Sequence, residues 1–267
     1  MFLVEEAKIN ILRIIVLLIF TSPSLASSPF ACDENETKLL LSKLEWITED
    51  YPPYNFYDKS SQLVGVFPEA LKLVYEELGI KLNINNIMIL PWSRLLMYMD
   101  HYPKYASFAM VTTSARAIKY KLVALPVTAK ISIMVLRSNV ELLKNKSFNE
   151  LNVAVVRGDI GKRLLDSQKI PVKQIETVSA LSMLKMLLYK RVDAIAYSED
   201  VAFFKFEQLG ADKNLMTPIL TLDDHSKVNF AFNKATSNCV VDMFKNKLLG
   251  LQVEGKIQLI WDKYVQK

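Results

Sequence analysis

The stretch that decides the fold is ASFAMVTTSARAIKY, residues 106–120. Residues 106–111 are mostly apolar, as in a buried strand, and the polar residues that follow predict a turn. Thr113 is a good N-cap, so we expect a helix over 114–120. Arg116 then lies in the first helical turn, where the partial positive charge of a helix start disfavours a cation. Either Arg116 is a surface or salt-bridged arginine, or an anion such as a ligand carboxylate is its partner.

Around this stretch the sequence alternates between strand-like and helix-like segments. This alternation predicts an α/β architecture with mostly parallel sheets, in which ligands bind outside the carboxyl ends of the strands. The loops after Thr48, Val111, Val156 and Ala196 are therefore expected to form one site. The expected strands are 44–48, one beginning at 81–84, 106–111, 131–136, 152–156, 192–197 and 227–232, and the expected helices are 67–78, one opening at 91, 114–120, one through 164–165, 180–189, 201–209, 237–249 and 254–265.

Residues 1–31 have the pattern of a secretory signal peptide. Lys8 and Arg13 lie before the apolar run 14–20, and small residues mark cleavage sites after Ala26 or Ala31. The apolar run is shorter than the roughly 20 residues that span a membrane, although an uncleaved N-terminal anchor is the alternative. No later segment is suited to stable membrane insertion. We therefore expect an exported protein of the periplasm.

Composition narrows the class of protein further. The chain has 267 residues, 51% hydrophobic and 23% charged, which suits one large domain or two small ones. Its formal net charge is +5, but the lysines are scattered, so we expect no nucleic-acid partner. Cys32 and Cys239 permit one disulfide in an exported chain. A lipid-modified Cys32 is not expected, because Pro29 stands where a lipobox has leucine.

Five segments stand out along the chain: YPPY at 51–54, GVFPEAL at 65–71, PWSR at 91–94, TSAR at 113–116, and KRVDA at 190–194. In their order the chain resembles the family 3 periplasmic solute-binding proteins, the amino-acid-binding components of ABC transporters, over about residues 42–265. The order and spacing of the segments are more specific than any one of them.

The resemblance implies a two-lobe periplasmic binding protein of type II, in which two α/β lobes close around a hinge on a small ligand. The first lobe would be discontinuous, formed by residues 38–128 and 224–267, and the second would be 129–223. Cys32 stands shortly before the first lobe and Cys239 lies within it, so this layout favours a bridge between them. We expect a monomer that delivers its ligand to an ABC permease or to a sensor protein.

Within this resemblance, Arg116 would hold a ligand carboxylate with two parallel hydrogen bonds. Thr113 would cap the helix and could also contact the ligand, while aromatic side chains would form the walls of the cleft. No cofactor and no metal are expected. The candidate ligand-binding residues are Arg116, Thr113, Trp92, Tyr51, Tyr54, Val111, Asp159, Tyr197 and Ser198.

Several positions depart from the family pattern. Relatives place an aspartate for the α-amino group where this chain has Ser198, and strand serines where it has apolar residues such as Val111. Asp159 stands where relatives usually have threonine; it would repel a carboxylate and attract a cation. Because a closed cleft binds a cation poorly without a nearby anion, either Asp159, Glu199 or Asp200 supplies that charge, or the ligand lacks an amine.

An enzyme is the alternative function, for example a lyase or dehydratase acting on a small acid, because some relatives on this fold are dehydratases. His101 and His225 lie in polar segments without metal-like spacing, and no Gly-x-Ser-x-Gly, Cys-His pair or phosphate loop is present. We therefore expect no catalytic residues. A sensor module independent of transport is the third possibility.

Overall fold

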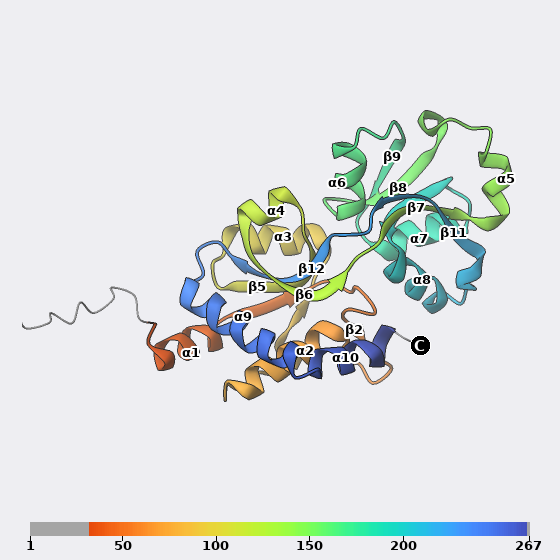
Figure 1. Cartoon of the computed structure of the whole chain (residues 1–267). Helices are drawn as coiled ribbons and strands as arrows, with labels where there is room; N and C mark the ends of the chain where they lie inside the picture. The colour runs from red at the N-terminus through yellow and green to blue at the C-terminus, as the bar shows by residue number, and fades with distance from the viewer. Residues whose placement is uncertain (1–31, 266–267) are drawn as a thin grey trace, which may run out of the picture. The chain divides into compact units, whose positions relative to one another are not determined.

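The computed structural model describes residues 32–265. The expected signal peptide and its two cleavage sites lie outside these described residues. From Asp33 onward the chain forms one compact unit that contains two five-stranded sheets (Figure 1). Within residues 32–265, no helix combines the length and the apolar character needed to cross a bilayer.

The first sheet is built around β5, whose seven residues are all buried. β5 pairs in parallel with β1, and β1 pairs in parallel with β4 at the sheet edge. On the other side β5 pairs antiparallel with β12, which pairs antiparallel with β6. The order is β4-β1-β5-β12-β6. The bounds are β1 Glu45–Thr48, β4 Met88–Ile89, β5 Tyr105–Val111, β6 Tyr120–Thr128 and β12 Lys227–Asn233.

The second sheet repeats this plan with a different set of strands. β10 pairs in parallel with β8, and β8 pairs in parallel with β9. β7 pairs antiparallel with both β10 and β11, which gives the order β11-β7-β10-β8-β9. The bounds are β7 Ile131–Leu136, β8 Asn152–Val156, β9 Lys173–Thr177, β10 Ala194–Ser198 and β11 Met216–Asp223; a separate hairpin joins β2 Phe56–Tyr57 to β3 Leu63–Val64.

The expectation of mostly parallel sheets is wrong, because each sheet is mixed. Parallel pairing needs a crossover connection, whereas antiparallel strands can follow one another directly. The chain passes from β6 into β7, and later from β11 into β12, through short connections between the sheets. The two connections are themselves paired, since the N–H of Ala129 donates to the carbonyl of Ser226 over 3.0 Å.

Helices cover both faces of each sheet (Figure 1). We define lobe 1 as the first sheet with α1–α4, α9 and α10, and lobe 2 as the second sheet with α5–α8. The bounds are α1 Glu34–Ser42, α2 Val66–Glu77, α3 Trp92–His101, α4 Ser114–Lys119, α5 Val140–Leu143, α6 Ile160–Ser167, α7 Ala180–Leu188, α8 Glu199–Gln208, α9 Asn238–Val253 and α10 Lys256–Val265.

Aromatic side chains fill the core of lobe 1. The ring of Trp46 in β1 lies 5.5 to 5.8 Å from the rings of Phe230, Phe232 and Phe244. Its indole N–H donates to the hydroxyl of Tyr75 in α2 over 2.7 Å. Because edge-to-face aromatic packing and a satisfied indole N–H both favour burial, β1 is held firmly, and the loop after it is anchored where it leaves the sheet.

Two other expectations from the sequence can be compared with the structure. The strand expected to begin at 81–84 is wrong, since Ile84–Asn86 is a 3₁₀ turn and the strand begins only at Met88. The side chain of Asn83 accepts the N–H of Asn85 and so favours the turn over the strand. Both cysteines, Cys32 and Cys239, are disulfide-bonded, as expected for an oxidised chain.

Candidate functional site

Arg116 is buried in the first turn of α4, with only 3% of its surface exposed. The hydroxyl of Thr113 accepts the backbone N–H of Arg116 over 3.1 Å, which is the expected N-cap. One guanidinium nitrogen, Nη1, donates to the carbonyl of Val111 over 2.7 Å. Nε and Nη2 have no hydrogen-bond partner among the described residues. Two buried donors on a cation are therefore left for another acceptor.

Trp92 lies at the start of α3 with 2% of its surface exposed. The guanidinium carbon of Arg116 lies 4.7 Å from the centre of the indole, a cation–π contact. The indole N–H points the other way and donates to the carbonyl of Gly158 in lobe 2 over 3.0 Å. Trp92 thus connects the arginine to the opposite lobe.

Asp159 follows Gly158 in the turn between β8 and α6. Gly158 has a φ of +72°, a conformation that favours glycine. Asp159 occupies the N-cap position of α6, but its side chain makes no capping hydrogen bond. It is 4% exposed, and its Oδ2 has no partner among the described residues. Burial raises the pKa of the Asp159 carboxyl, and the charge of Arg116 partly opposes that rise.

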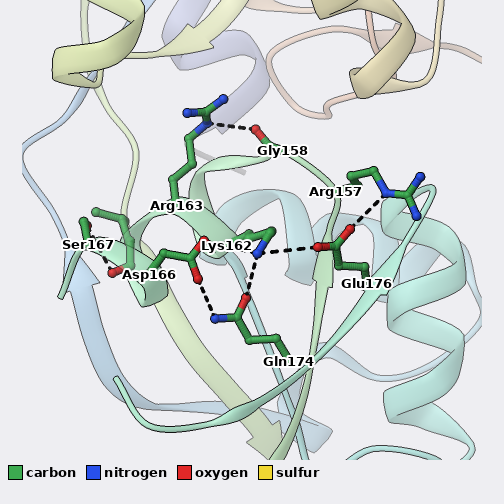
Figure 2. A network of polar contacts seen from close by, with 9 residues as sticks. Arg157, Gly158, Lys162, Arg163, Asp166, Ser167, Gln174 and Glu176 are labelled. Atoms are coloured by element: carbon green, nitrogen blue, oxygen red, sulfur yellow. Dashed lines mark hydrogen bonds and ion pairs between the residues drawn. The ribbon is translucent and has the colours of Figure 1, made fainter. Parts of the chain in front are cut away.

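The position of α6 depends on a close contact with β10. A Cβ at Gly161 would lie 2.0 Å from the carbonyl oxygen of Ala196, so a larger residue has no room there. Arg163, two residues later, donates from Nε to the carbonyl of Gly158 over 3.1 Å, as Figure 2 shows. These contacts hold the turn that carries Asp159 firmly in lobe 2.

A polar network continues from this turn along α6 and β9 (Figure 2). Arg157 pairs with Glu176 over 2.9 Å, and Lys162 pairs with the same carboxylate over 3.5 Å. Lys162 also contacts Asp166 over 3.1 Å, and Gln174 donates to Asp166 over 2.8 Å. The network ties α6 to β9, and each of these partially exposed pairs contributes little by itself.

Three tyrosines form the aromatic part of the site. Tyr51 and Tyr54, in the loop after β1, stack with ring centres 5.6 Å apart. Tyr197 at the end of β10 meets Tyr51 edge to face at 5.8 Å. The hydroxyl of Tyr54 donates to Asp200 over 3.3 Å, whereas that of Tyr51 has no partner among the described residues. Burial, followed by the charge of Asp159, raises the pKa of Tyr51.

Of the three acidic residues considered as the amine partner, two are already bonded. Glu199 accepts the hydroxyl of Ser132 over 2.5 Å and lies 3.3 Å from the ammonium of Lys130. Asp200 accepts the hydroxyl of Tyr54. Of the three, only Asp159 has a buried oxygen without a partner among the described residues. The hydroxyl of Ser198 also has no partner there.

Sequence reasoning missed three charged residues that line a cavity beside Trp92. Lys205 in α8 is 5% exposed and pairs with Asp50 of lobe 1 over 2.5 Å. Glu49 lies beside them, and burial, followed by the charge of Asp159, raises its pKa well above the usual value. A signal for Lys205 was present, since it lies on the same helical face as the buried Val201 and Ala202.

Two cavities flank these residues. One, of ≈ 220 Å³, is lined from lobe 1 by Glu49, Pro91 and Trp92 and from lobe 2 by Val156 and Lys205, among others. The other, of ≈ 620 Å³, is lined by residues 112–115 of lobe 1 and by α6 residues that include Arg163. Both lie between the lobes, beside the buried charges.

The structure thus brings most of the expected site residues to one place, at the carboxyl ends of β1, β5, β8 and β10. The contacts of Trp92 and Tyr51 connect the parts of the site in lobe 1 with those in lobe 2. Thr113 and Val111 lie beside Arg116 and hold its backbone and its guanidinium. Nε and Nη2 of Arg116 can donate hydrogen bonds to an anion, and Oδ2 of Asp159 can accept a hydrogen bond from a cation.

The amino-acid sequence matches a known family. The pattern of the bacterial extracellular solute-binding proteins, family 3, covers residues 46–267. No curated protein sequence matches the chain.

Solved structures that resemble this one include proteins with different roles. A histidine kinase sensor domain with similarity to periplasmic binding proteins has a TM-score of 0.70 at 16% identity, covering 84% of this chain and 96% of its own. An amino acid ABC transporter substrate-binding protein from Streptococcus pneumoniae, bound to L-arginine, has a TM-score of 0.69 at 19% identity. The match covers 87% of this chain and 97% of that protein. The ancestral amino acid-binding protein AncCDT-1, a precursor of cyclohexadienyl dehydratase, has a TM-score of 0.68 at 20% identity. The match covers 86% of this chain and 98% of that protein. These likenesses establish the two-lobe α/β fold.

Proposed function

The chain belongs to the bacterial extracellular solute-binding proteins, family 3, and we propose that it binds a small ligand with both a carboxylate and an amine between its lobes. One observation carries this proposal. Arg116 has two buried donors without a partner, and Asp159 has a buried acceptor without a partner. Unpaired buried charges of opposite sign are costly, and a zwitterion between them would satisfy both.

The chemistry of each anchor suits its part of the ligand. The planar guanidinium of Arg116 can donate two parallel hydrogen bonds to a carboxylate. The carboxylate of Asp159 can accept a hydrogen bond from an ammonium group. Asp159 would thus replace the aspartate that relatives have at the position of Ser198. Tyr51 and Tyr197 supply apolar walls with a hydroxyl edge. An α-amino acid or a close relative combines these properties.

Ligand binding would close the lobes, because the two anchors belong to different lobes. Closure is a population shift whose extent is limited by the ligand's extra contacts in the closed form. Among the structural relatives, one is a transporter component bound to L-arginine and another is a sensor domain. We propose delivery to an ABC importer in the periplasm, with signalling through a sensor partner as the alternative.

A thermal-shift screen of the amino acids, organic acids and polyamines tests the proposal. Stabilisation grows as RT ln(1 + [L]/Kd), so micromolar binders register at millimolar concentration. Each amino acid that binds is then compared with its deaminated acid and its decarboxylated amine. We expect both analogues to lose most of the shift. Equal binding of the deaminated acid would remove the amine from the proposal, and no binding by any carboxylate would overturn it.

An enzymatic role is the second candidate, and Glu49 favours it. Burial raises the pKa of the Glu49 carboxyl, and a raised pKa is typical of carboxyls that act as general acids. It lines a cavity between the lobes together with Lys205. The ancestral relative named above is a precursor of a dehydratase. Incubating a bound ligand with the protein and following it by NMR would decide: turnover that Glu49→Gln abolishes supports a lyase, and an unchanged ligand excludes it.

A further inference from the structure

The start of α3 sits directly on the turn between β8 and α6. The indole N–H of Trp92 donates to the carbonyl of Gly158 over 3.0 Å. One helical turn later, Leu96 reaches the same glycine, since its Cδ1 lies 3.6 Å from the position that a Cβ on Gly158 would take. Residues four apart share one helix face. This face of α3 therefore carries the contact between lobe 1 and the Gly158 turn.

The same indole also contacts the carboxylate anchor. Its ring centre lies 4.7 Å from the guanidinium carbon of Arg116. The face of the indole therefore contacts Arg116. Its edge contacts Gly158, the residue before Asp159. A planar, rigid ring between two sites transmits a fixed distance, unlike a long flexible side chain.

The turn at the other end of the indole is rigid within lobe 2. The Gly158 carbonyl also accepts Nε of Arg163 over 3.1 Å, as drawn in Figure 2. The helix that follows is pressed onto β10 at Gly161, where even a methyl group would collide with a backbone carbonyl. A shift of Trp92 relative to Gly158 therefore means a shift of one lobe relative to the other.

We propose that Trp92 is a positioning residue that sets the separation between Arg116 and Asp159 in the closed site. It thereby selects ligands whose carboxylate and ammonium are attached to one carbon, over those whose charges are further apart. This inference rests on the proposed function, because it assigns the two charges of the ligand to these two anchors.

The test uses two isomers as probes, 2-aminobutyrate and 4-aminobutyrate, which have the same atoms and differ in the spacing of their charges. Trp92→Phe keeps an aromatic face over Arg116 and removes the N–H that reaches Gly158. We expect the wild type to prefer 2-aminobutyrate. In Trp92→Phe its affinity should fall about tenfold, as for loss of one hydrogen bond, while the affinity for 4-aminobutyrate stays constant. Titration calorimetry gives the ratio of the two dissociation constants.

Trp46→Phe is the matched control. It also removes an indole N–H bond, the 2.7 Å bond to the Tyr75 hydroxyl, but within the core of lobe 1. We expect this variant to lower the melting temperature and to keep the wild-type ratio. A merely structural role of Trp92 would give the same pattern in both variants.

Three results would overturn the inference. The first is an unchanged ratio in Trp92→Phe; the second is a wild type that binds both isomers equally, which leaves the proposed function standing. The third is a wild type that binds neither isomer; if organic acids also fail to bind, the proposed function fails as well. Should Trp92→Phe not fold, Leu96→Ala loosens the same contact and should also reduce the ratio.

Discussion

At the scale of single residues, the site contains two buried side chains of opposite charge, and each has polar atoms without a hydrogen-bond partner among the described residues. Arg116 gains a cation–π contact and one carbonyl, but Nε and Nη2 have no partner among the described residues. Burial lowers the pKa of Arg116 and raises that of Asp159, and each charge partly offsets the shift of the other. Buried charged atoms without a partner cost stability, and such a cost is common at functional sites.

Arg116→Met should abolish carboxylate binding. Methionine fills part of the volume and keeps an apolar contact with Trp92, but it offers no donor. Losing one partner of a buried charge pair weakens binding by about 100-fold or more. Calorimetry measures the affinity, and circular dichroism checks that the fold is retained. Binding within a few-fold of the wild type would exclude Arg116 as the carboxylate anchor.

Asp159→Asn should stabilise the unliganded protein above acidic pH. The pKa of Asp159 is raised in the folded state, so between the unfolded and the folded pKa the unfolded state binds fewer protons. The free energy of unfolding therefore falls as pH rises through this window, and it falls no further above the folded pKa.

The asparagine variant lacks this decrease, so its advantage should be absent below the unfolded pKa near 3.9 and grow with pH. We expect the free energy of unfolding to rise by about 1 kcal/mol or more. In a protein of this size, each kcal/mol raises the melting temperature by about 2–4 °C. Melting curves from pH 3 to 8 measure it. Equal melting temperatures at all pH values would contradict the buried, unpaired carboxyl.

At the scale of elements, the lobes meet through the ends of α3 and α8. Helix α8 places Lys205 on its buried face, where the ammonium pairs with Asp50 in the loop after β1. Two aromatic rings, Phe56 of β2 and Phe204 of α8, lie 5.0 Å apart. A charged side chain at an apolar position of a helix is costly without its partner.

Two substitutions in this ion pair should differ in their effect on stability. Asp50→Ala leaves the buried ammonium of Lys205 without its carboxylate and should cost about 3 kcal/mol. Lys205→Met removes the charge, fills the space and should be neutral or slightly stabilising. Urea denaturation of both variants measures the free energies of unfolding. Equal losses in the two variants would mean that the ion pair itself, rather than the buried charge, sets the energy.

At the scale of the whole molecule, the expected two-lobe α/β fold is confirmed. The chain passes twice between the two sheets, from β6 to β7 and from β11 to β12. These connections are joined by a hydrogen bond from the N–H of Ala129 to the carbonyl of Ser226. Such short connections can act as a hinge, and the contacts of Trp92, Tyr54 and Lys205 join the lobes at the site. The hinge and the precise bounds of the lobes stay predictions.

Ligand binding should reduce the radius of gyration in solution. The ligand adds bonds to both anchors only when the lobes are closed, so it shifts the population toward the compact form. X-ray scattering with and without a saturating ligand from the screen measures the change. Arg116→Met should show no change at the same ligand concentration. A wild type whose radius is the same in both conditions would exclude closure driven by the ligand.

Much of the local structure could be predicted from periodicity and capping. The strand at 131–136, the strand at 152–156 and the helix capped by Thr113 are present at the expected places. The periodicity of a segment reports which face is buried but not the direction of its neighbours in the sheet. The mixed pairing of both sheets therefore could not be predicted from it.

The sequence by itself determined the α/β class and the place of Arg116 at a helix start, because these depend on residues close together in the chain. Only the tertiary structure decided which of three acidic residues lacks a partner, and that Trp92 reaches Gly158. The Trp92–Gly158 bond joins residues 66 positions apart, and the bonds of Glu199 and Asp200 join residues at least 67 positions apart. Burial and pairing of a charge are properties of the folded surroundings, and a local pattern cannot report them.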